Sequence, residues 1–186
     1  MKKLLLCFAL ALSVPTLACP NRAALAFPSP VSTYSPANLR HHYEQAAASK
    51  EAGEKFYDLL HSYNDQNALV LGYKAASEAI KARDASMLNK LTYVQQATRT
   101  FEQAVSLDPK NAEIRFLRFS VESNLPPFLG LSKHVEEDKN FLLGAALQHP
   151  HSGLDDDAFQ RVRGFLVGRK HVSEAEAHQL AQVKSS

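Results

Sequence analysis

Cysteine is nearly absent from this sequence of 186 residues, and both cysteines, Cys7 and Cys19, lie near the N-terminus. A chain that has lost its first 26 residues therefore contains no thiol. Even in an oxidising compartment such a chain forms no disulfide and carries out no thiol chemistry. We expect its stability to come from side-chain packing.

Glycine is also scarce, with 7 residues, and several glycine-dependent motifs are missing. The sequence has no GxSxG nucleophile motif and no glycine-rich phosphate loop. No segment alternates polar and apolar residues as a half-buried strand does. These absences argue against strands and against the common hydrolase and nucleotide-binding sites, so we expect no catalytic residue, no cofactor and no enzyme activity.

A cluster of basic residues is missing as well. The formal net charge is +2, and removal of residues 1–26 takes away Lys2, Lys3 and Arg22 but no acidic residue, which leaves −1. Nucleic acids and anionic membrane surfaces attract proteins through clustered Lys and Arg. We therefore expect neither of them as a partner.

The first residues have the layout of a secretory signal peptide. Lys2 and Lys3 precede an apolar run over residues 4–14, which Pro15 closes. This run is shorter than the ~20 residues that a membrane-spanning helix needs. The small residues Ala24 and Ala26 favour cleavage after Ala26, so we predict export to the periplasm or out of the cell, with no membrane span in the mature chain.

Cys19 leaves a second processing route open. Leu17, Ala18 and Cys19 partly resemble the lipoprotein signal, in which a lipid is attached to a cysteine after the apolar run. That signal usually has Leu three residues before the cysteine, where this chain has Thr16. A lipid anchor at Cys19 is thus the alternative to a soluble exported protein, and it is not favoured.

The remainder divides into a proline- and serine-containing linker, residues 27–35, and a helical domain, residues 36–186. Ser35 and Pro36 favour a helix start, and Ser173 with Glu176 forms a capping-box pattern. Periodicity predicts an all-α fold of six to seven helices, arranged as antiparallel hairpins in a compact bundle. The expected helices span about 36–62, 67–83, 86–107, 111–122, 132–149, 155–168 and 173–183.

The third of these helices has apolar residues at intervals of three and four, which predicts one inward-facing stripe. Its members are Leu88, Leu91, Val94, Thr98, Phe101 and Val105. Within it, Ala97, Phe101, Ala104 and Pro109 resemble the second helix of a tetratricopeptide repeat. The resemblance covers about residues 67–123, with Leu71 and Gly72 similar to the first helix. It implies close packing of helix pairs and a concave surface that receives a peptide.

The loop over residues 124–131 is unusually apolar, since it contains Leu125, Phe128 and Leu129. Two interpretations remain open. The loop folds over the core of the domain, or its side chains anchor a protein partner.

Two clusters of polar residues suggest chemistry. His149, His151 and Asp155–Asp157 carry the ligand types that zinc prefers. The aspartates also suit a helix N-terminus, which favours negative charge. Glu136, Glu137 and Asp138 form a run at a helix start, which we interpret as a solvated face. We therefore expect no metal site and no catalytic carboxylate pair.

The sequence thus favours an exported, non-catalytic module that binds a protein or peptide of the cell envelope through a helical groove. The alternative function is a metal-binding or metal-dependent hydrolytic protein centred on His149 and His151.

Overall fold

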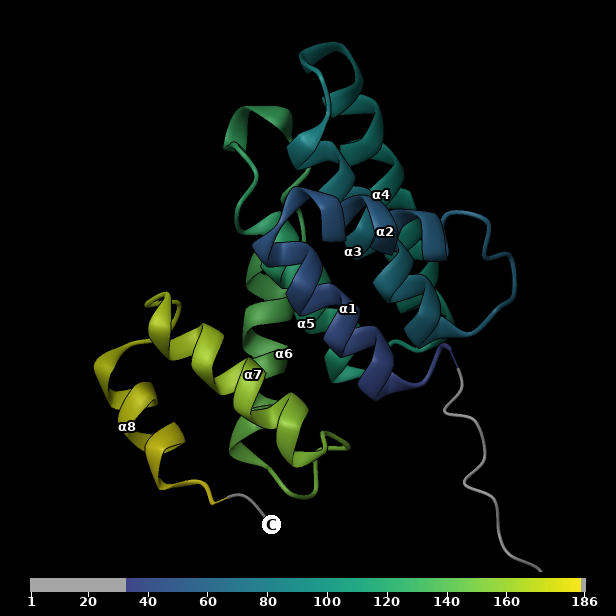
Figure 1. The fold of residues 1–186 in the computed structure, drawn as a ribbon. Coiled ribbons are helices and arrows are strands. Elements are labelled where there is room, and N and C mark those ends of the chain that lie inside the picture. The colour runs from purple at the N-terminus through teal and green to yellow at the C-terminus, as the bar shows by residue number, and fades with distance from the viewer. Residues whose placement is uncertain (1–32, 185–186) are drawn as a thin grey trace, which may run out of the picture. The chain divides into compact units, whose positions relative to one another are not determined.

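The computed structural model describes residues 33–184, and all regular structure in this range is helical (Figure 1). This confirms the all-α prediction, but with eight α-helices and one short 3-10 helix instead of six or seven helices. The elements are α1 (Pro36–Ala48), α2 (Lys50–Leu60), α3 (Ala68–Asp84), α4 (Met87–Leu107), α5 (Ala112–Glu122), η1 (Pro127–Leu129), α6 (Val135–Leu147), α7 (Asp156–Gly168) and α8 (Glu174–Gln182). The predicted signal peptide, Cys19 and most of the predicted linker lie outside the described residues.

The extra helix arises at Ser49, where the helix expected over residues 36–62 is interrupted. Ser49 has an extended backbone, with φ −143° and ψ 148°, and its hydroxyl accepts a hydrogen bond from the amide of Ala52. It therefore ends α1 and caps α2 at the same position. Gly53 lies inside α2.

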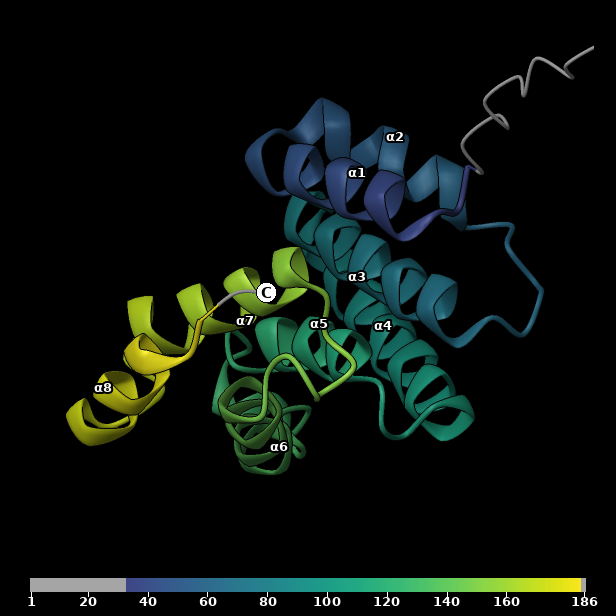
Figure 2. The same ribbon diagram turned by 90° about the horizontal axis from the view of Figure 1, so that it is seen from below.

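The helices form successive layers (Figure 2). α1 and α2 pack on α3, α3 packs on α4 and α5, and α5 packs on α6. Two main hydrophobic clusters result. One joins α1, α2 and α3 around Phe56 and Tyr73, and the other joins α5 to α8 around Phe119 and Phe159. A small cluster of Leu71, Ala104 and Ile114 lies between α3, α4 and α5.

The hairpin of α3 and α4 contains the residues of the repeat-like motif. Ala97, Phe101 and Ala104 are all buried in α4, and α4 ends at Leu107 shortly before Pro109. On α3, Gly72 permits a close approach of α5, because a Cβ atom there would lie 3.3 Å from Cγ1 of Ile114. Gly72 thus lets α5 approach α3 closely. Membership of the tetratricopeptide family stays a prediction.

Polar side chains begin most of the helices where the sequence placed them. Asn67, Asn111 and Asp155 accept hydrogen bonds from the first turns of α3, α5 and α7. The capping box of Ser173 and Glu176 is confirmed at α8. The expected start of a helix at residue 132 is wrong, because the hydroxyl of Ser132 donates to the carbonyl of Glu122, and α6 begins later, after His134.

The fold starts within the predicted linker. The ring of Tyr34 packs edge-on against that of Tyr63, with 5.1 Å between ring centroids. Within residues 33–184, no helix combines the length and the apolar character needed to cross a lipid bilayer.

Candidate functional site

An apolar pocket lies where the hairpin of α3 and α4 meets the end of α5. We call it the end pocket, and its volume is about 350 Å³. Its lining combines residues of α1, α3, α4, α5 and the loop that follows α5: Tyr43, Ala76, Ala79, Ile80, Ala82, Arg83, Lys90, Val94, Ser120, Val121, Asn124 and Leu125.

The pocket exists because the packed helices differ in length. α4 has 21 residues and α5 has 11, which corresponds to roughly 31 Å and 16 Å. α5 starts beside the end of α4 and runs back along it, so about the first two turns of α4 extend beyond α5. Asn124 and Leu125 of the loop after α5 line one side of this space.

Small side chains keep the pocket open on the α3 side. Ala76, Ala79 and Ala82 recur at intervals of three on α3, and all three line the pocket. Such residues share one helix face and leave the volume in front of them unfilled. Larger apolar residues on the other elements, such as Val94 and Val121, form the remaining walls.

A small group of polar side chains is held in place at one side of the pocket. The hydroxyl groups of Tyr43 and Ser120 are 3.3 Å apart, and the amide nitrogen of Asn124 donates to the carbonyl of Ser120 at 2.7 Å. Burial raises the pKa of Tyr43, so its phenol stays neutral at physiological pH. The group therefore supplies hydrogen-bonding atoms but no charge.

The only charged residues in the lining are Arg83 and Lys90, and both are cationic. Arg83 is neutralised by the carboxylate of Asp84 at 2.7 Å, and it also donates to the carbonyls of Ala46 and Ala47. The side chain of Lys90 has no hydrogen bond and no close ion pair within the described part of the chain, but its positive charge also helps to lower the pKa of Asp84. One carboxylate thus faces two cations, and the end pocket is an apolar space with one positive charge in excess.

Large apolar side chains surround this end of the domain on the outside. Leu88 is 90% exposed, Met87 83% and Leu91 46%, all on the part of α4 that extends beyond α5. Phe128 of η1 is 86% exposed and follows the pocket residue Leu125 by three positions. We call Met87, Leu88, Leu91 and Phe128 the end surface. Figure 1 shows the turn between α3 and α4 and the loop with η1 at the same end of the described domain.

The inward stripe predicted for this helix is therefore wrong in its first part. Leu88 and Leu91 face solvent, whereas Val94, Ala97 and Phe101 face the core. Helical periodicity identifies a face of α4 correctly only where another helix lies opposite.

Different residues of the apolar loop fit the two interpretations. Leu125 is half-buried in the wall of the end pocket, and Leu129 is half-buried too, so part of the loop covers the domain. Phe128 alone projects into solvent. The loop both folds onto the domain and presents one aromatic side chain.

The candidate metal ligands, His149, His151 and Asp155–Asp157, lie in one region of the fold, but their side chains bind different partners. Nε2 of His149 lies 2.9 Å from Oδ1 of Asp156, and the imidazole stacks on Phe159. Asp155 and Asp157 instead pair with Arg40, and His151 is exposed. Among residues 33–184 no group of three or more His, Cys, Asp or Glu side chains is arranged to hold a metal ion.

Arg40 joins three helices that are distant in sequence, and sequence reasoning missed it. Its buried guanidinium makes a two-point contact with Glu113 of α5, with both distances 2.7 Å, and it also pairs with Asp155 and Asp157 at the start of α7. The hydroxyl of Tyr73 donates to Glu113 as well, at 2.5 Å. These bonds connect α1 and α3 to α5 and α7.

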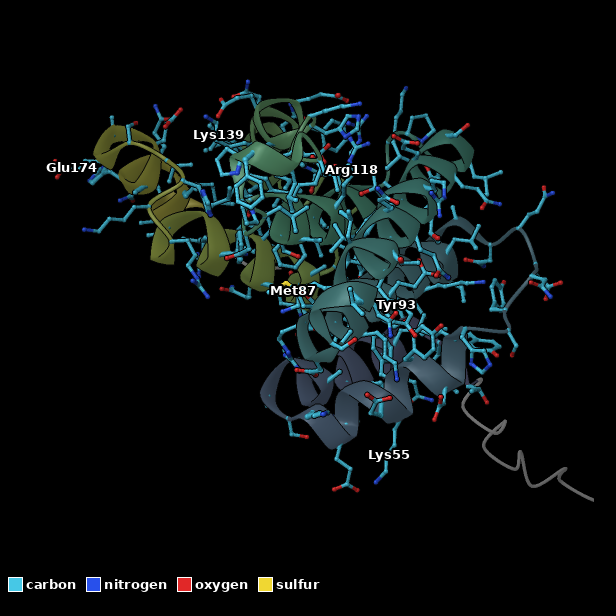
Figure 3. The ribbon with its side chains drawn as sticks, turned by 90° about the horizontal axis from the view of Figure 1, so that it is seen from above. Lys55, Met87, Tyr93, Arg118, Lys139 and Glu174 are labelled. Carbon is cyan, nitrogen blue, oxygen red and sulfur yellow. The ribbon has the colours of Figure 1, made fainter. Side chains whose placement is uncertain are left out.

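A second buried cluster corrects the interpretation of residues 136–138. Glu136 is exposed, but Asp138 is fully buried and accepts hydrogen bonds from Arg115 and Arg118 at 2.7–2.9 Å. Arg118 is labelled in Figure 3. Glu137 also pairs with Arg115, so two residues of the charge run connect α6 to α5.

These charged clusters are saturated by their own internal hydrogen bonds, whereas the end pocket offers open apolar volume and an excess positive charge. The end pocket and the end surface are therefore the candidate site. Comparisons with protein-family models, with curated proteins and with solved structures found no match for this chain.

Proposed function

We propose that this protein is an exported, non-catalytic interaction module whose end surface binds an amphipathic helix of another cell-envelope protein. The observation that supports the proposal is the exposure of Met87, Leu88, Leu91 and Phe128 together at one end of the domain. Single exposed apolar residues are normal on protein surfaces, but a group on two adjoining segments is typical of a contact site.

The geometry favours a helix as the bound element. Leu88 and Leu91 lie on adjacent turns of the part of α4 that extends beyond α5, with no helix of this domain packed over them. A second helix can lay its apolar residues along such a stripe, as in other helix-in-groove complexes. Phe128 lies on η1, three residues after Leu125 of the pocket wall, and would contact the bound helix from its flank.

The experiment is site-specific photo-crosslinking in the native host. A photoreactive amino acid at position 88 and, separately, at position 128 is expected to give an adduct with the same protein. Position 55 is the matched surface control, because Lys55 projects from α2 away from the end surface (Figure 3). Different adducts at positions 88 and 128, or none, would contradict the proposal.

Purified partner then allows a quantitative check. Leu88→Glu places a charge in the proposed contact, and we expect it to weaken binding at least tenfold, since central apolar anchors contribute ~2 kcal/mol or more. Val167→Glu is the control, because Val167 is also a partly exposed apolar residue but belongs to α7. Equal effects of the two substitutions would refute a specific role for the end surface.

A further inference from the structure

We propose that the end pocket binds a linear aliphatic chain with a single anionic head group, and that Lys90 pairs with that group. The proposal concerns the interior of the pocket. It does not depend on the helix-binding function, which concerns the outer residues of the end surface.

The volume and lining of the pocket suit one flexible apolar chain. Binding pockets for small molecules measure ~300–1,000 Å³ and are mostly apolar with a few placed polar groups. At about 350 Å³ the end pocket is near the lower limit, and aliphatic side chains make up most of its lining. A space of this size accepts a single chain more readily than a large cofactor.

The charges of the pocket select the head group. No Asp or Glu lines the pocket. Asp84 pairs with Arg83 at 2.7 Å and also interacts with the charge of Lys90, so a single carboxylate faces two cations and one positive charge is left in excess. One cation balances one negative charge. An apolar chain that ends in a carboxylate would satisfy both the walls and Lys90, whereas a cationic amphiphile would be repelled by the excess positive charge.

The probe for the test is dodecanoate, added below its critical micelle concentration and followed by isothermal titration calorimetry and NMR. We expect saturable binding of one dodecanoate per protein. Octanoate and decanoate should bind progressively more weakly, because each buried methylene tightens binding by up to about fourfold. Dodecanol and dodecyltrimethylammonium have equally long chains without the negative charge and should bind at least tenfold more weakly.

Two variants locate the binding site. Ala79→Trp places an indole in the pocket from a half-exposed position of α3 and should weaken dodecanoate binding at least tenfold. Ala177→Trp is the matched control, since Ala177 is also half-exposed but lines a different pocket between α7 and α8. Lys90→Glu changes only an exposed side chain, and it should reverse the preference from dodecanoate to dodecyltrimethylammonium. This variant keeps the test valid if the tryptophan variant fails to fold.

Three results would overturn the proposal: uptake that does not saturate, binding that Ala79→Trp leaves unchanged, or equal affinity for the charged and uncharged probes. A further result would reassign the pocket. If dodecanoate does not bind but Ala79→Trp abolishes the crosslink from position 88, the pocket belongs to the protein-binding site. If dodecanoate binds and no common crosslink forms, the helix-binding function fails while the ligand site stands.

Discussion

Glu78 shows how a single buried carboxyl group affects the stability of this domain. It lies on α3 with no solvent exposure, and its Oε1 accepts one hydrogen bond from Gln96 of α4 at 2.9 Å. Its Oε2 has no hydrogen-bond partner. Burial raises the pKa of Glu78 above the ordinary value of 4.5, because the low-polarity interior disfavours the charged form.

A glutamine at this position should make the protein more stable at neutral pH. Because the pKa of Glu78 is raised in the folded state, the protonated carboxyl group favours folding. This contribution to the free energy of unfolding is complete below about pH 4.5 and is lost as the pH rises through the pKa of the folded state. Glu78→Gln removes the loss. We therefore expect the stability of the variant relative to the natural protein to be higher at pH 7 than at pH 4.

Urea unfolding at the two pH values measures this difference. Glu51→Gln is the control, because Glu51 is exposed on α2 and pairs only with Lys55. A stability difference between Glu78→Gln and the natural protein that is independent of pH would show that the carboxyl group does not titrate in this way.

Arg40 is the residue for which we expect the largest loss. Arg40→Met keeps most of the side-chain volume but leaves the partly buried carboxylate of Glu113 without its cation. Breaking a buried ion pair from one side costs ~3–5 kcal/mol. Lys55→Met removes an exposed i,i+4 pair instead and should cost ~0.5 kcal/mol or less. Chemical denaturation of both variants tests the comparison, and similar losses would contradict the buried role of Arg40.

At the scale of helices, two glycines have opposite surroundings. Substituting each by alanine distinguishes the effect of packing from the effect of intrinsic helix propensity on stability. A Cβ atom at Gly53 of α2 would lie 2.9 Å from Cγ2 of Ile80 on α3, whereas one at Gly164 of α7 would meet nothing within 4 Å. Alanine is more favourable than glycine in a helix by ~1 kcal/mol. Only Gly164 is free to realise this gain.

We therefore expect Gly164→Ala to raise the thermal midpoint and Gly53→Ala to lower it. In the second variant the close contact forces α2 away from α3, because the Cγ2 methyl of the β-branched Ile80 cannot swing aside easily. Thermal unfolding followed by circular dichroism measures both. An increase in both variants would mean that α2 and α3 have room to separate.

The unequal lengths of α4 and α5 also predict a difference along one helix. Buried residues of α4 begin at Val94, and the turns before it carry only exposed or partly exposed side chains. Amide hydrogen exchange should therefore be faster over residues 88–93 than over residues 97–105, because local opening of the first turns exposes little apolar surface. Equal protection along α4 would contradict this.

For the whole domain, the sequence predicted what depends on local chemistry. Helix starts at Ser35 and Ser173 followed from capping side chains, and burial of Ala97, Phe101 and Ala104 followed from their spacing. These features depend on residues within one or two turns of each other. They can be identified without knowledge of the neighbouring helices.

The errors concern features that depend on distant parts of the chain. The partners of Arg40 are 73 to 117 positions away, so no local pattern indicates the network. Leu88 and Leu91 fit a helical stripe, but their exposure depends on where α5 ends. The break at Ser49 was missed because helical periodicity resumes directly after it. The candidate site was therefore predictable only in part, through Phe128 and Leu125.

The alanine row on α3 and the extended start of α4 have a consequence for how the chain can vary among related proteins. Because no core residue of α4 precedes Val94 and the last buried residue of α3 is Ala82, whole turns can be inserted at the tip of this hairpin without repacking the interior. Such insertions would deepen the pocket and leave the rest of the domain intact. Natural variants that differ in hairpin length should therefore share one scaffold and differ in the length of the molecule they accommodate.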